Sequence, residues 1–201
     1  MRTSAFRSAG VGFALLLLSN GIVGCAGPSS ASPGMAGALL APSAIRAPQA
    51  PVDLSRIRQA TARFQNIDVA LGAGYVDDGY GCIDATTFGL DPSLGAMGFH
   101  LINETLHADP TTDPTAPDLL VYEPAHGGGT PKLVALEYEV FKDDWFGYAG
   151  AGAGAAPPTL LGHDFLSIDL DDLHVFALHL WLWRDNPNGA FEDFNPRVSC
   201  R

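Results

Sequence analysis

The sequence predicts an α+β fold in which an antiparallel, curved β-sheet packs against an N-terminal amphipathic helix. Three patterns indicate this fold. Apolar residues recur at helical spacing in residues 53–72, two alternating segments flank a glycine-rich turn, and a late segment is apolar on both faces. The helix and the sheet are therefore expected to share one hydrophobic core.

The predicted helix covers residues 53–72. Asp53 can cap its first turn by accepting backbone N–H bonds, and Gly72 can adopt the left-handed conformation that ends a helix. Arginine and glutamine side chains separate the residues of its apolar stripe, which are Leu54, Ile57, Thr61, Phe64, Ile67 and Leu71.

Shorter elements follow the helix. A turn-rich stretch leads to residues 98–102, which are predicted to form a short strand. Residues 109–118 contain Pro110, Pro114 and Pro117. Because proline lacks the N–H that a sheet needs, we predict an exposed acidic loop there.

The clearest sheet signal lies in residues 119–142. Strands are predicted at residues 119–123 and 132–142, joined by a hairpin at the glycine run 127–129. His126 and this run also match the oxyanion loop of some esterases, but the chain has no Gly-x-Ser-x-Gly elbow, so a turn is the better explanation. Alternation in the longer strand assigns Val134, Leu136, Tyr138 and Val140 to one face, and Leu133, Ala135, Glu137, Glu139 and Phe141 to the other.

Two further segments complete the predicted domain. Residues 150–158 contain only alanine, glycine and proline, which favours a flexible surface loop. Residues 174–183 are apolar on both faces, which predicts a central strand covered on both sides, with His179, Trp181 and Trp183 on one face. The turn-rich C-terminal segment then leads back toward Cys82.

The 201 residues divide into three predicted parts. Residues 1–24 form a signal peptide, residues 25–51 form a tether rich in alanine, proline, glycine and serine, and residues 52–201 form a single globular domain. The chain has 11 basic and 22 acidic residues, and removal of Arg2 and Arg7 with the signal peptide leaves 9 basic ones. This acidic balance argues against nucleic acid as a partner.

The N-terminal segment resembles that of a bacterial lipoprotein precursor. Residues 22–25, Ile-Val-Gly-Cys, match a lipobox after a basic start and a short apolar run. The resemblance implies that Cys25 carries palmitate or a similar lipid and anchors an exported protein to the cell envelope. Ala26, in place of aspartate, implies the outer membrane and its periplasmic face.

Two cysteines remain after Cys25 is assigned to lipid. Cys82 and Cys200 lie in an oxidising compartment if the chain is exported, so we predict a disulfide between them. Free buried thiols and metal ligation are the alternatives. The chain has no Cys-x-x-Cys spacing that would favour a metal.

Histidines and carboxylates in the predicted strands are candidate metal ligands. If the strands carrying His100, Glu137 and His179 pair, two imidazoles and a carboxylate converge as in a mononuclear site for one divalent transition metal. Glu123 or His163 would complete the coordination. The alternative is that these histidines are hydrogen-bonded inside a packed core.

Four segments resemble a family of exported bacterial proteins of unknown function: residues 97–103, 119–124, 134–138 and 179–200. The resemblance extends from about Ala60 to the C-terminus. Leu101 stands where that family has an aromatic residue, and Phe194 stands where it has a tryptophan. The family supplies no reaction and no catalytic residue, so it supports export and a single domain.

Two functions follow from these observations. The first is a non-catalytic envelope lipoprotein whose domain binds a small ligand or an envelope protein. The alternative is a divalent-metal-binding protein or a metal-dependent enzyme that uses His100, Glu137 and His179. The sequence does not decide whether the protein is an enzyme.

Overall fold

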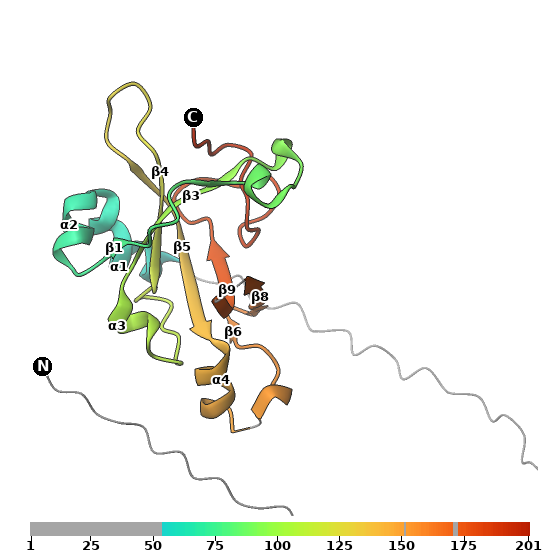
Figure 1. Cartoon of the computed structure of the whole chain (residues 1–201). Helices are drawn as coiled ribbons and strands as arrows, with labels where there is room; N and C mark the ends of the chain where they lie inside the picture. The colour runs from blue at the N-terminus through green and yellow to red at the C-terminus, as the bar shows by residue number, and fades with distance from the viewer. Residues whose placement is uncertain (1–53, 151, 171–172) are drawn as a thin grey trace, which may run out of the picture. The chain divides into compact units, whose positions relative to one another are not determined.

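A computed structural model describes residues 54–201 except residues 151, 171 and 172 (Figure 1). The predicted signal peptide, lipobox and tether lie outside the described residues, as does Asp53. In residues 54–150, 152–170 and 173–201, no helix has the length and apolar character needed to cross a membrane.

The N-terminal region contains three short helices instead of the single one predicted. These are α1 (Ser55–Thr61), the 3-10 helix η1 (Ala62–Gln65) and α2 (Ile67–Gly72). The break falls at Asn66, which is extended (φ −95°, ψ 112°) and accepts a hydrogen bond from the Asp68 amide, as an N-cap residue does. The last of these helices ends at Gly72 as predicted, but the left-handed conformation expected there belongs to Gly74, whose φ is +94°.

A seven-stranded antiparallel sheet forms the centre of the domain, which confirms the mixed helix and antiparallel-sheet class. Its order is β1-β3-β4-β5-β9-β8, and β2 also pairs with β3. A separate hairpin pairs β6 (Thr159–Leu160) with β7 (His163–Asp164). The strands of the main sheet are β1 (Val76–Asp77), β2 (Ile83–Asp84), β3 (Ala96–Ile102), β4 (Leu119–Glu123), β5 (Lys132–Phe141), β8 (Leu166–Leu170) and β9 (Leu173–Leu180).

Five short helices connect the strands: η2 (Ala85–Phe88), η3 (Pro92–Leu94), α3 (Glu104–His107), α4 (Lys142–Tyr148) and η4 (Gly152–Gly154). Lys142 therefore begins a helix and does not extend β5 as predicted. Within residues 150–158, which are predicted to form a flexible surface loop, the Ala156 carbonyl accepts a hydrogen bond of 2.8 Å from Trp145 Nε1.

The predicted hairpin between β4 and β5 is present, and Gly127 and Gly128 have the positive φ angles that its turn requires. A β-bulge, however, changes the predicted faces of β5. Tyr122 pairs with Leu133 and Val121 pairs with Ala135, so Val134 is an extra residue. Leu133 therefore joins Leu136 and Tyr138 on one face, while Val134 packs with Ala135 on the other.

The first face of the sheet, which carries Leu120, Leu136 and Leu178, holds the larger core. Ile57, Phe64 and Ala70 from the N-terminal helices belong to the same cluster. The buried Tyr122 hydroxyl donates to the Phe64 carbonyl at 2.7 Å, which satisfies both groups.

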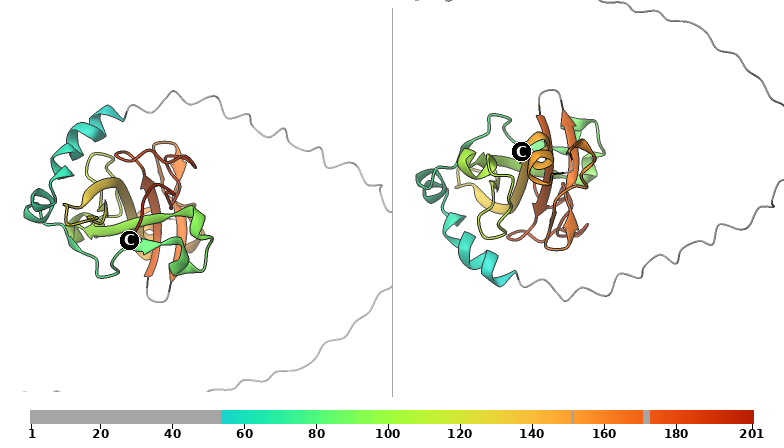
Figure 2. Two further views of the ribbon diagram at one scale, coloured as in Figure 1. Left: turned by 90° about the horizontal axis from the view of Figure 1, so that it is seen from above. Right: turned by 90° about the horizontal axis from the view of Figure 1, so that it is seen from below.

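The second face, which carries Val121, Ala135 and Ala177, is covered in part by the C-terminal segment (Figure 2). Buried Asn195 exchanges backbone hydrogen bonds with Ala96, and the disulfide between Cys82 and Cys200 is present as predicted. Gly95 permits this close approach, because a Cβ atom there would lie 2.1 Å from the Asn195 carbonyl oxygen.

Two predicted positions on these faces are wrong. Strand β9 lies between β5 and β8, as a central strand does, but it ends at Leu180. Trp183 therefore lies beyond the strand and packs against the core of the first face, not beside His179. The predicted exposed loop 109–118 ends in two buried residues, Pro117 and Asp118, because Asp118 Oδ2 accepts the Glu139 amide hydrogen at 3.1 Å.

Candidate metal centre

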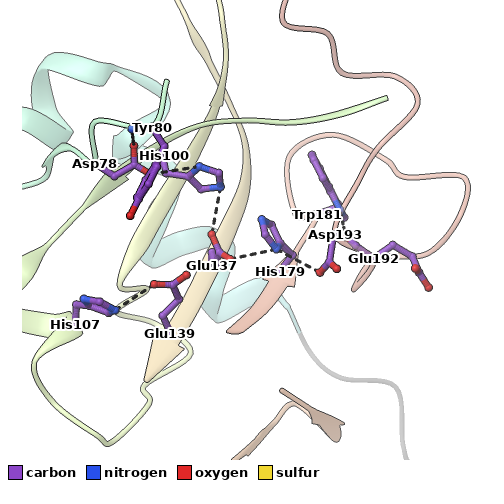
Figure 3. A network of polar contacts seen from close by, with 10 residues as sticks. All are labelled: Asp78, Tyr80, His100, His107, Glu137, Glu139, His179, Trp181, Glu192 and Asp193. Carbon is purple, nitrogen blue, oxygen red and sulfur yellow. Dashed lines mark hydrogen bonds and ion pairs between the residues drawn. The ribbon is translucent and has the colours of Figure 1, made fainter. Parts of the chain in front are cut away.

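Strands β3, β5 and β9 bring His100, Glu137 and His179 together on the second face of the sheet (Figure 3). Glu137 on β5 pairs directly with His179 on β9, whereas His100 on β3 pairs with Val121 on the intervening strand β4. Glu137 pairs with Leu119 on the same strand β4, so His100 and Glu137 lie on either side of β4. One potential ligand atom from each of the three residues lies within 4.8 Å of the others.

Glu137 lies between the two imidazoles. Its Oε2 is 3.2 Å from His100 Nε2, and its Oε1 is 3.3 Å from His179 Nδ1. A metal ion with tetrahedral bonds of about 2.1 Å holds its ligand atoms about 3.4 Å apart. The two nitrogen–oxygen distances are close to this value, although they involve different oxygens of Glu137; one ligand atom from each residue lies within 4.8 Å of the others.

All three residues are buried, with only 3–4% of each exposed. His100 Nδ1, His100 Nε2 and His179 Nε2 have no hydrogen-bond partner in the part of the chain that the structure describes. Buried polar atoms are nearly always hydrogen-bonded, and each one that is not costs about 1–3 kcal/mol. The Glu137 carboxylate is the ion-pair partner of both imidazoles, and a bound cation would also satisfy ring nitrogens that make no hydrogen bond.

Burial also sets the protonation of the group. Burial and, to a smaller extent, the nearby His179 lower the pKa of His100 to about 3. Burial raises the pKa of Glu137 to about 8, although His179 opposes that rise. Burial lowers the pKa of His179, but Glu137, Asp193 and Glu139 together outweigh it, so the net pKa is raised. His100 is thus a neutral imidazole with a lone pair, the form that binds metals.

Further carboxylates surround the group. Asp78 Oδ2 lies 3.7 Å from His100 Nδ1, and Asp193 Oδ1 lies 3.7 Å from His179 Nδ1. Beside them on the second face, buried Glu139 is 3.1 Å from His107 Nε2. Asp78, Asp193 and His107 were not predicted from the sequence, because they lie in turns or a short helix where strand alternation assigns no position.

Two predicted ligands lie elsewhere. Glu123 forms an ion pair with Arg184 and lies 3.8 Å from His126 Nε2. His163 is exposed and stacks on Phe191, with ring centroids 3.7 Å apart. Neither residue belongs to the group of His100, Glu137 and His179, so the prediction that one of them completes its coordination is wrong.

A surface groove borders the same region. Asp193 lines it together with mainly apolar residues from η2, β3, β8 and the C-terminal segment. Phe88, Leu90, Leu166 and Leu170 in this groove are more than 40% exposed. The groove is the feature of the described chain most suited to a small apolar ligand.

Comparisons of the chain with protein families, with curated proteins and with solved structures found no match. The resemblance to exported proteins of unknown function therefore stays a prediction.

Proposed function

We propose that the domain binds one divalent transition metal ion through His100, Glu137 and His179. The observation that supports this most is the pair of buried imidazoles on either side of one buried carboxylate, with three of their four ring nitrogens making no hydrogen bond among the described residues. A bound cation would accept the lone pair of one nitrogen from each imidazole and compensate the Glu137 charge.

Binding of the metal would also stabilise the folded domain. Its three ligands come from β3, β5 and β9, which are distant in sequence, so an ion that binds only the folded chain shifts the folding equilibrium toward it. Three protein ligands also leave room for a fourth. We assign no reaction to the site.

We further propose that lipid on Cys25 anchors the domain at the periplasmic face of the outer membrane. The lipobox at residues 22–25 supports this proposal. Replacement of Cys25 by serine is expected to move the protein from the membrane fraction to the soluble fraction. Membrane retention of C25S equal to that of the wild type would contradict the anchor.

Zinc titration tests the metal site. The purified chain, stripped with chelator and dialysed, is expected to bind one Zn²⁺ in calorimetry. Glu137→Gln preserves the shape of the side chain but removes its charge, and H179A removes a ligand. Each is expected to weaken binding by at least about 100-fold, since even partners of metal ligands contribute 10–100-fold.

His163→Ala is the matched control, because His163 is an exposed histidine outside the group. It is expected to bind Zn²⁺ as the wild type does. A folded wild-type chain that binds no Zn²⁺, or an equal loss in H163A, would contradict the proposal. The apolar groove would then favour the alternative function, a module that binds a small ligand.

A further inference from the structure

Asp193 approaches the candidate metal centre from outside the sheet. Its Oδ1 lies 3.7 Å from His179 Nδ1, the same nitrogen that faces Glu137 Oε1 at 3.3 Å. The Asp193 side chain is 37% exposed, whereas His179 and Glu137 are buried. Asp193 therefore stands between the buried group and solvent (Figure 3).

The backbone on both sides of Asp193 is held in place. Trp181 Nε1 donates to the Glu192 carbonyl, and Asn186 Nδ2 donates to the Phe194 carbonyl at 2.9 Å. The next residue, Asn195, is fully buried and pairs with Ala96. These anchors at 192, 194 and 195 hold the backbone at Asp193 beside the buried group, although it lies outside regular secondary structure.

We propose that Asp193 is the fourth ligand of this centre, which completes a two-histidine, two-carboxylate site for Zn²⁺. The three residues whose ligand atoms lie within 4.8 Å of one another do not include Asp193, so its partly exposed side chain would turn inward when the ion binds. The inference rests on the proposed metal-binding function. Four nitrogen and oxygen ligands match the four-coordinate geometry that Zn²⁺ prefers in proteins. Because the side chain of Asp193 is the most exposed of the four, the ion would enter and leave on its side.

Asp78 has a different position and a different role. It faces Nδ1 of His100, on the opposite side of the ring from the Nε2 that faces Glu137. A carboxylate at that position does not share the metal with Nε2. Its distance of 3.7 Å from Nδ1 is too long for a hydrogen bond, but it places a carboxylate on the side of the ring from which carboxylates commonly orient metal-binding histidines.

Substitution of Asp193 tests this assignment. Asp193→Asn keeps the size of the side chain and the anchored backbone but removes the charge. Zn²⁺ affinity in the purified chain is expected to fall at least about tenfold. The visible absorption of bound Co²⁺, which reports the number and geometry of its ligands, is expected to change. The melting temperature without metal is expected to stay near that of the wild type.

Glu192→Gln is the matched control, because it removes the same charge from the adjacent position. It is expected to leave both the affinity and the Co²⁺ spectrum unchanged. Wild-type affinity and an unaltered spectrum in D193N would overturn the role of Asp193 while the three-ligand site stands. A wild-type chain that binds neither ion would overturn the site and this inference together.

Discussion

Removal of the disulfide between Cys82 and Cys200 is expected to lower the free energy of unfolding by about 4 kcal/mol. The bond joins residues separated by 118 positions, so it closes most of the described domain into one loop. A cross-link that closes so long a loop strongly reduces the conformational entropy of the unfolded chain. In the folded state it fastens the C-terminal segment beside β2, near the pairing of Asn195 with Ala96.

Urea unfolding of the C82S/C200S variant, compared with the wild type under oxidising and reducing conditions, measures this effect. The reduced wild type and the variant are expected to have the same lowered stability, and the variant should not respond to reductant. A variant that differs from the oxidised wild type by less than about 1 kcal/mol would contradict the structural role of the bond.

Replacement of Asp118 by asparagine is expected to stabilise the domain at pH 8 and to have little effect near pH 4. Burial raises the pKa of Asp118 from 3.8 to about 7, despite the hydrogen bond from the Glu139 amide. The folded state therefore holds a proton that the unfolded state releases, and the stability this provides is lost as pH rises from about 4 to 7. The pKa change corresponds to about 4 kcal/mol.

The amide side chain introduced by D118N would remain neutral and could still accept the Glu139 amide hydrogen, so the variant should lose this part of the pH dependence. Thermal or urea unfolding at pH 4, 6 and 8 provides the measurement. Asp109→Asn is the control, because Asp109 lies in the same segment and bonds only the nearby Thr111. Parallel pH profiles for D118N and the wild type would rule out this account.

The parts of the fold that were predicted well from the sequence depend on simple periodicity. Strand β4 has the predicted bounds, and β5 differs by one residue, because a glycine turn separates two alternating apolar runs. The break at Asn66 was missed because the apolar spacing continues through it. The bulge at Val134 was missed because it depends on the pairing partner, which one strand alone does not specify.

Strand periodicity also explains which residues of the candidate site could be predicted from the sequence. His100, Glu137 and His179 were found because each lies in a predicted strand, where alternation assigns it a face. Asp193 was not found, since its position depends on hydrogen bonds from Trp181 and Asn186 to its neighbours in a loop. His163 was a reasonable candidate by residue type, but its hairpin, β6–β7, is separate from the main sheet.

Metal content is the most direct test of the central claim. The protein would be purified from its native compartment without chelator and without a histidine tag, and elemental analysis would count the bound ions. We predict one divalent transition metal ion per chain in the wild type and none in Glu137→Gln. A folded wild-type sample with no bound metal would contradict the proposed centre of His100, Glu137 and His179.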